Sequence, residues 1–336
     1  MRDQTRKLFK ILCARFAAGF GVADVSQQFS VSPTVQQLLK DKIVEASTFL
    51  PRINFIIVDE LKGENILAGA SGPVTGRTDT TGDAERSPRD VLGLEKFTYE
   101  LAATQSDVYM RYNTVDAWAK FKDMAERYSR YVWARMASDM EIIGWNGVSV
   151  AATTNLVANP MLQDVNKGWL QYMRDNKPAN VLPQGSVAGK IRFGAGGDFV
   201  NLDVAVHDLL QGIPSFLRQD LVALIGTDLI AQEKSALMAA VGGKPTEKTL
   251  AQLSLATFGG LPWETPSNFP ARGLVITSLD NLSIYQQDGS WRRQIVDNPK
   301  KDRVEDYNSR NEGYVVETPE KLVAWEFNNV KLEGEW

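Results

Sequence analysis

The clearest hydrophobic pattern in the chain covers residues 115–143, where apolar side chains recur at steps of three and four residues. This spacing places them on one face of a helix. Asn113 or Thr114 can cap the start of the helix, and Gly144 and Gly147 can end it. The pattern therefore predicts one amphipathic helix of about 30 residues, roughly 45 Å long.

Shorter patterns predict further elements on both sides of this helix. Alternating apolar residues indicate strands, and helical spacing indicates helices. Asp288-Gly289 is a hairpin signal, and we expect the C-terminal strands to return to the sheet that begins before residue 115. The mixture indicates an α+β fold. The predicted strands are 52–58, 97–101, 108–112, 221–225, 274–277, 282–285 and 323–327, and the predicted helices are 202–211 and 227–242.

Residues 59–95 interrupt these patterns with repeated glycines and alternating charges. Structureless loops longer than about 15 residues are uncommon in compact domains, so the segment is expected to be functional or disordered. Two interpretations remain open at this point, a flexible surface loop and a projecting two-stranded arm. An isolated hairpin is marginal in water, so such an arm would need a neighbouring subunit on which to lie. The charges at its tip are Arg77, Asp79, Asp83, Glu85 and Arg86.

The first 30 residues combine apolar and basic side chains at helical spacing, which predicts a short amphipathic basic helix. A merely solvated helix face is the alternative. The chain has 336 residues and 43% hydrophobic residues, which predicts two lobes with a substantial core. The glycine-rich stretch 194–197 predicts a boundary between them. The start lacks the apolar run of a secretory signal, and nowhere do about 18 apolar residues follow one another, so we expect cytoplasmic synthesis.

Candidate chemistry is sparse. Cys13 is the only cysteine and His207 the only histidine, which argues against a disulfide and against a cysteine-rich or multi-histidine metal site, and both are interpreted as structural. The glycine and lysine patterns at 189–196 and 243–244 do not complete a dinucleotide or phosphate-binding motif, so no cofactor is expected. The adjacent acids Glu305 and Asp306 are expected at a solvated surface. The segment 291–293, Trp-Arg-Arg, is expected to make inter-subunit salt bridges and cation-π contacts. A net charge of -4 predicts only weak, nonspecific contact with DNA.

Several short motifs stand out along the chain. They are Thr78-Asp-Thr-Thr-Gly82, Gly144-Trp145-Asn146-Gly147, Asn159-Pro-Met-Leu-Gln-Asp164, Gly168-Trp169-Leu170-Gln171 and the C-terminal block that includes Asn281 to Tyr285 and Trp291 to Val296. With them the chain resembles the Peduovirus-type major capsid proteins of tailed phages. The resemblance implies the Hong Kong 97-type capsid fold. Its parts would be an N-terminal arm (1–50), an extended β loop with flanking strands (51–113), a peripheral domain with a long spine helix (114–194), an axial domain (195–273) and a return to the peripheral sheet (274–336).

The resemblance also implies a function. Copies of the chain would form the hexamers and pentamers of an icosahedral shell around packaged double-stranded DNA, assembled in the host cytoplasm and found in the virion. The chain would not be an enzyme and would bind no metal, cofactor or membrane. Its partners would be itself, a scaffold, a maturation protease and a portal. The charged loop tip would contact a neighbouring subunit, and the N-terminal arm could be cut between Phe29 and Ser30.

Two alternatives remain at this point. One is a soluble hydrolase with a dispersed carboxylate site, which a deep pocket lined by convergent acids would reveal. The other is a nonviral encapsulating shell protein, which would differ in its cargo.

Overall fold

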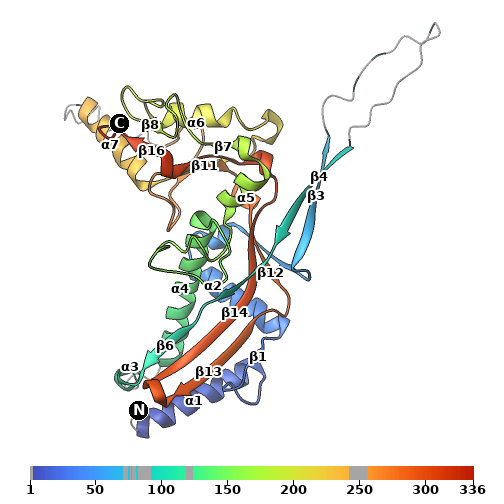
Figure 1. Ribbon diagram of the computed structural model, residues 1–336, viewed down its shortest axis with the longest axis vertical. Helices are drawn as coiled ribbons and strands as arrows, with labels where there is room; N and C mark the ends of the chain where they lie inside the picture. Colours follow the sequence, from blue (N-terminus) through green and yellow to red (C-terminus); the bar gives the residue numbers. More distant parts are fainter. Residues whose placement is uncertain are drawn as a thin grey trace. The chain divides into compact units, whose positions relative to one another are not determined.

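The computed structural model describes residues 3–70, 75, 77, 81, 92–118, 124–241 and 256–336. The chain separates into two compact units (Figure 1). The smaller unit is Lys62–Glu100, and the larger unit contains Met1–Leu61 and Leu101–Trp336. Each unit is described by itself below.

The larger unit contains a seven-stranded sheet built around the long strand β14 (Arg303–Val316). The other strands of the sheet are β1 (Phe29–Ser30), β2 (Asn54–Val58), β5 (Ala102–Gln105), β6 (Val108–Arg111), β12 (Leu282–Gln287) and β13 (Arg292–Asn298). β12 and β13 lie end to end along one side of β14. Ser309 pairs with β13 and Glu312 with β12, and both residues also pair with β5, which therefore lies on the other side.

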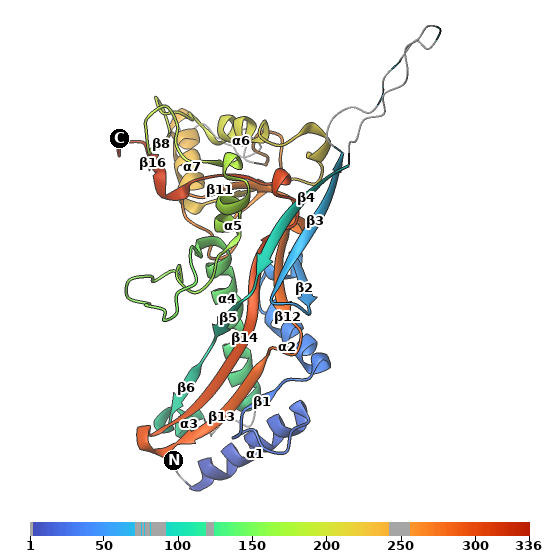
Figure 2. The same ribbon diagram turned by 45° about the vertical axis from the view of Figure 1, so that its right-hand side comes forward.

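The same pairings place β5 and β6 at one edge of this sheet and β1 and β2 at the other. β1 is antiparallel to β13, and β2 is parallel to β12. Figure 2 shows β2 on the outer side of β12, away from β14. The C-terminal strands thus join strands from before residue 115, as the sequence predicts.

The hairpin prediction at Asp288-Gly289 is wrong. Gly289 does adopt a left-handed turn conformation with φ of 63°. However, β12 and β13 both run antiparallel to β14, so the chain continues in the same direction after the turn. Gln286 pairs with Glu312, and Arg292 pairs with Ser309. Residues 287–291 therefore lie opposite only residues 310 and 311 of β14, and the segment forms a bulge. The real reversal joins β13 to β14 and uses Asp302, whose φ is 51°.

The long helix is confirmed as α4 over Met124–Asn146, about 35 Å long. Residues 119–123 lie outside the described residues. The capping prediction is wrong, since Asn113 and Thr114 lie inside the helix α3, which already begins at Tyr112. Figures 1 and 2 show α4 beside the sheet. The accompanying helices are α1 (Asp3–Phe20), α2 (Pro33–Glu45), α3 (Tyr112–Trp118) and α5 (Trp169–Asn176).

A second sheet, in the order β10-β9-β11-β15-β7, has its own apolar core. The predicted helices 202–211 and 227–242 are found as α6 and α7 over nearly these bounds. β11 and β15 join this sheet and not the sheet of β14. All their residues are buried, and Leu274, Ile276, Val323 and Trp325 belong to its apolar core. The elements are β7 (Val181–Leu182), β9 (Val222–Ile225), β10 (Trp263–Glu264), β11 (Leu274–Thr277), β15 (Val323–Trp325), α6 (Leu202–Leu210) and α7 (Thr227–Val241).

A two-stranded parallel sheet adjoins this core, formed by β8 (Ile191–Phe193) and β16 (Val330–Leu332). Short 3-10 helices connect many of the elements of the larger unit. They are Leu50–Arg52, Pro178–Asn180, Ser215–Leu217, Leu279–Asn281, Pro299–Lys301, Pro319–Lys321 and Phe327–Asn329.

The smaller unit is a two-stranded antiparallel sheet of β3 (Lys62–Ala70) and β4 (Leu92–Glu100). Cross-strand ion pairs join Lys62 to Glu100 at 2.6 Å and Lys96 to Glu64 at 3.0 Å. The structure thus agrees with the two-stranded interpretation over these strands. None of the described helices has the length and apolar character needed to cross a membrane.

Candidate functional site

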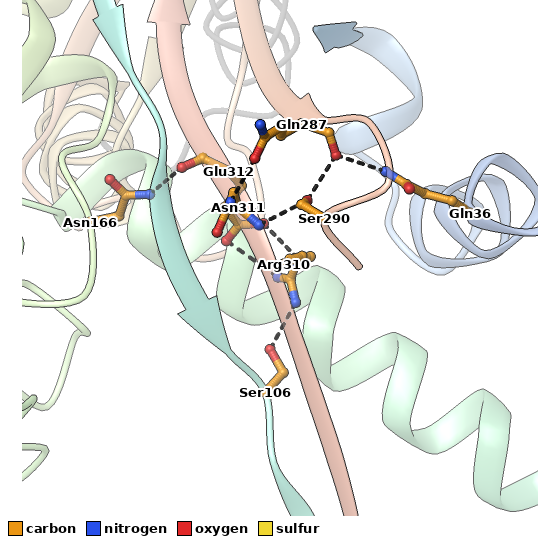
Figure 3. A network of polar contacts seen from close by, with 8 residues as sticks. All are labelled: Gln36, Ser106, Asn166, Gln287, Ser290, Arg310, Asn311 and Glu312. Carbon is orange, nitrogen blue, oxygen red and sulfur yellow. Dashed lines mark hydrogen bonds and ion pairs between the residues drawn. The ribbon is translucent and has the colours of Figure 1, made fainter. Parts of the chain in front are cut away.

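A buried ion pair lies in the middle of β14. Arg310 and Glu312 are two residues apart, so their side chains leave the strand on the same face. The guanidinium donates two hydrogen bonds to the carboxylate, with Nε to Oε2 at 2.6 Å and Nη2 to Oε1 at 3.3 Å. Their side chains are only 2% and 1% exposed. Arg310 Nη1 also donates to Ser106 Oγ at 3.0 Å, which ties β14 to the interruption between β5 and β6 (Figure 3).

The neighbouring residue, Asn311, faces the other way and holds the bulge. Its backbone N–H donates to Ser290 Oγ at 3.2 Å, and its Nδ2 donates to Gln287 Oε1 at 2.7 Å. Gln36 reaches the same bulge from α2, donating to the Gln287 carbonyl at 3.2 Å and accepting from the Gly289 N–H at 3.2 Å (Figure 3). Gln36 is 0% exposed. The network therefore fixes how β12 passes into β13.

Asn166 completes this network from the segment before α5. Its Nδ2 donates to the Glu312 carbonyl at 2.8 Å, and the residue is buried (Figure 3). Because the Glu312 carboxylate is fully engaged by Arg310 and shielded from solvent, it is poorly placed to transfer a proton to a substrate. The arrangement is suited to rigidity, since a satisfied buried network favours one packing over others.

A second buried pair joins β13 to β14 and reaches two helices. Arg293 binds Asp306 with Nε to Oδ1 at 3.0 Å and Nη2 to Oδ2 at 2.7 Å. Tyr128 of α4 donates its hydroxyl to Asp306 Oδ2 at 2.9 Å. Burial, followed by the Asp306 charge, raises the pKa of Tyr128, so the hydroxyl remains a donor. The rings of Phe16 and Phe20 in α1 cover the guanidinium at 4.9 and 5.2 Å.

These contacts correct two sequence-based expectations. Arg293 makes its ion pair and cation-π contacts within the chain, not between subunits. Glu305 and Asp306 are both buried and not at a solvated surface. A strand pattern of Arg-x-Glu, present at 303–305 and 310–312, is the signal that could have indicated ion pairs on one face.

Phe29 and Ser30, the predicted processing junction, form β1 and pair with Arg293 and Arg292 of β13. The Phe29 ring lies 5.3 Å from the Phe20 ring. The N-terminal helix α1 is held by a separate apolar cluster that combines it with β13 and β14. Its buried members are Phe9, Leu12, Val25, Ile295 and Val304.

The predicted loop tip is represented by one described residue, Arg77, which is exposed. Asp79, Asp83, Glu85 and Arg86 lie outside the described residues. The structure therefore does not test whether these five charges come together.

The remaining candidates offer little chemistry. His207 is exposed on α6. Burial raises the pKa of the Cys13 thiol to about 11, so it is not an activated nucleophile. Among the described residues, no three histidine, cysteine, aspartate or glutamate side chains could hold a metal ion. A groove of about 810 Å³ between α1, α2 and α4 has two acids in its lining, Glu45 and Glu126, and Glu45 is paired with Lys42 at 2.7 Å. It is not the acid-lined pocket expected of a hydrolase.

Comparison with known proteins identifies a family that matches this chain. The model of the family described as phage major capsid protein, P2 family, matches residues 8–327. The capsid protein of Escherichia phage P2 is 39% identical over 338 aligned residues, covering 94% of this chain and 92% of that protein. The major capsid protein of Serratia phage KSP20 is 32% identical and covers 94% of both chains.

A solved structure agrees with this assignment. The structure of the satellite phage P4 procapsid, which includes the size determination protein, matches with a TM-score of 0.77, 37% identity and coverage of 99% of each chain. The α+β capsid fold expected from the sequence is therefore confirmed. The chain belongs to the P2 family of phage major capsid proteins.

Proposed function

We propose that copies of this chain form the hexamers and pentamers of an icosahedral shell that encloses packaged double-stranded DNA. As a member of its family, the chain is a major capsid protein of a tailed phage, a structural component of the virion and not an enzyme, and it assembles with copies of itself. The match to the P4 procapsid over 99% of both chains is the observation that carries the proposal. Because the chain belongs to this family, we reject the two alternatives, a hydrolase and a nonviral shell protein.

The physical basis that we infer is avidity. Many weak contacts that close into rings and then into a shell engage together, which gives a stability that no single contact has. In this proposal the sheet of β14 with α4 forms the peripheral domain, and the sheet of β9 and β11 forms most of the axial domain. A scaffold, a maturation protease and a portal are the further partners, and DNA is contacted only weakly.

Negative-stain microscopy of the purified protein tests the shell directly. The complete chain is expected to give uniform hollow particles. A variant without residues 1–29 is expected to assemble less uniformly if the arm directs assembly, since it loses Phe9, Leu12 and Val25 from the cluster on β13. Only irregular aggregates or single subunits from the complete chain, under conditions where it is folded, would contradict the proposal.

We propose that the charged loop tip, Arg77, Asp79, Asp83, Glu85 and Arg86, docks on an adjacent subunit. The support is its alternation of opposite charges and the marginal stability of an isolated two-stranded sheet. Reversing Arg77 and Arg86 to Glu should lower the yield of particles and their resistance to salt. Reversing the exposed Lys300 and Lys301 to Glu changes the net charge equally and is the matched control. Equal yields from the two variants would count against the docking.

We further propose that the maturation protease cuts between Phe29 and Ser30. Mass spectrometry of the protein from mature particles should then give a chain that begins at Ser30. A chain that retains the arm in mature particles would contradict this.

A further inference from the structure

Strand β2 leaves an apolar edge of the larger unit without a strand partner. Within the described residues it pairs only with β12 and ends the sheet on that side (Figure 2). Its five residues, Asn-Phe-Ile-Ile-Val, include no charge, proline or glycine. The Ile57 side chain is 38% exposed.

The register shows which backbone groups face outward. The Val58 carbonyl accepts from the Asp288 N–H at 2.9 Å, so the backbone of Val58 faces β12. The N–H and C=O groups of one strand residue point to the same side, and this side alternates along the strand. Asn54 and Ile56 therefore also face β12. The N–H and C=O groups of Phe55 and Ile57 face the open edge.

Other strands in the described part of the chain have features that limit edge pairing. β1 has two residues, and β5 and β6 are interrupted at Ser106 and Asp107. The outer strands of the second sheet, β7 and β10, also have two residues each. β3 and β4 carry charged side chains in cross-strand ion pairs. Natural proteins protect exposed edges with short strands, interruptions and charges, and β2 has none of these.

We propose that the β2 edge is a docking site for an extended segment of a second copy of this chain, which adds a strand beside Phe55 and Ile57. Strand addition supplies main-chain hydrogen bonds for the N–H and C=O groups of Phe55 and Ile57, which have no strand partner among the described residues. A second copy is the partner because members of this family assemble with themselves, so each shell presents this edge to many copies. The uncharged strand also causes no repulsion between copies. The inference rests on self-assembly and goes beyond it by naming the surface.

Hydrogen exchange with residue resolution tests the pairing. It compares the soluble subunit, isolated by size-exclusion chromatography, with assembled particles. The amide N–H groups of Phe55 and Ile57 should exchange at least roughly tenfold more slowly in particles. The Ile56 N–H, which already faces β12, is the internal reference and should change much less. Particles in which Phe55 and Ile57 exchange as fast as in the free subunit would overturn the proposal, although the protein would still be a shell protein.

A pair of variants separates the backbone from the side chain. Ile57→Pro removes the outward N–H, whereas Ile57→Ala removes most of the exposed side chain but keeps the N–H. Ile57→Pro should reduce the yield of particles at least roughly fivefold relative to Ile57→Ala. Circular dichroism of both subunits checks that they remain folded. If a folded Ile57→Pro subunit assembles as well as Ile57→Ala, the proposal is wrong, and if it does not fold, the exchange experiment still decides.

Discussion

The guanidinium carbon of Arg293 in β13 lies 4.9 Å from the centre of the Phe16 ring in α1. The same guanidinium binds the buried carboxylate of Asp306, which in turn accepts the hydroxyl of Tyr128 in α4. The N-terminal helix therefore covers an ion pair that also contacts the long helix. Because a buried charge is costly when its surroundings are disturbed, the docking of α1 and the packing of β13 should be coupled.

The first prediction concerns this coupling. Phe16→Ala removes a ring from above Arg293 and should weaken the docking of α1 by about 1–2 kcal/mol, which raises the undocked population roughly 5- to 30-fold. Cys13 belongs to the same apolar cluster and reports undocking through its rate of reaction with a thiol reagent under native conditions. Ile11→Ala, at an exposed position of the same helix, is the control. Equal rates in the two variants would show that the ring does not hold the arm.

The second prediction concerns the bulge between β12 and β13. Gln36→Ala leaves the Gly289 N–H without its acceptor and removes one donor from the Gln287 carbonyl. The expected loss is about 1–3 kcal/mol in the free energy of unfolding, because buried polar groups lose their partners. Urea unfolding measures it. Gln37→Ala changes the exposed neighbour on the same helix and should have almost no effect.

The third prediction concerns the stability of the fold at low pH. The Tyr307 hydroxyl, the Arg303 guanidinium and Asn298 lower the pKa of Glu305 from 4.5 to about 2. A carboxyl whose pKa is lower in the folded state stabilises the fold above its unfolded pKa, and this contribution is lost as the pH falls toward the folded pKa. The stability difference between the wild type and Glu305→Gln should therefore be constant above about pH 5.5 and shrink between about pH 4.5 and 2.

Urea unfolding midpoints of both proteins at pH 7, 4 and 2.5 would measure this difference. A difference that stays the same over this range would show that the lowered pKa does not contribute. Asp280→Asn, at an exposed carboxylate in the 3-10 helix before β12, is the control and should follow the wild type.

Some elements could be predicted because local spacing alone specifies them. The apolar residues of α4 recur at helical steps, and most of β9 and β11 is continuous apolar sequence. β14 was not predicted as a 14-residue strand, because its buried side chains include Glu305, Asp306, Asn308, Arg310 and Glu312. Polar residues thus occupy buried positions of the strand, so the alternation of apolar and polar residues that predicts a strand is absent. Ion pairs and hydrogen bonds within the sheet make this burial possible. The contact between Gln36 and Gln287 spans 251 residues, and no local pattern indicates it.

The structure explains why two positions of the sequence motifs are glycine. Residues 144–147 close α4, and Gly168 precedes α5. A Cβ at Gly168 would lie 2.3 Å from the carbonyl oxygens of both Ile143 and Gly144. A Cβ at Gly147 would lie 2.2 Å from the Asn166 carbonyl oxygen. These are backbone atoms that cannot rotate away, so the crossing requires residues without a side chain.

The close crossing at Gly168 gives the fourth prediction. Gly168→Ala should force the two segments apart and separate Trp145 from Trp169, whose ring centres now lie 4.8 Å apart. We expect a loss of at least about 2 kcal/mol in the free energy of unfolding, measured in urea, together with a changed tryptophan fluorescence spectrum. Gly19→Ala is the matched control, because a Cβ there has no atom within 4 Å and alanine favours the helix α1. If both variants unfold at the wild-type midpoint, the segments can separate without cost and the close contact does not determine how α4 meets α5.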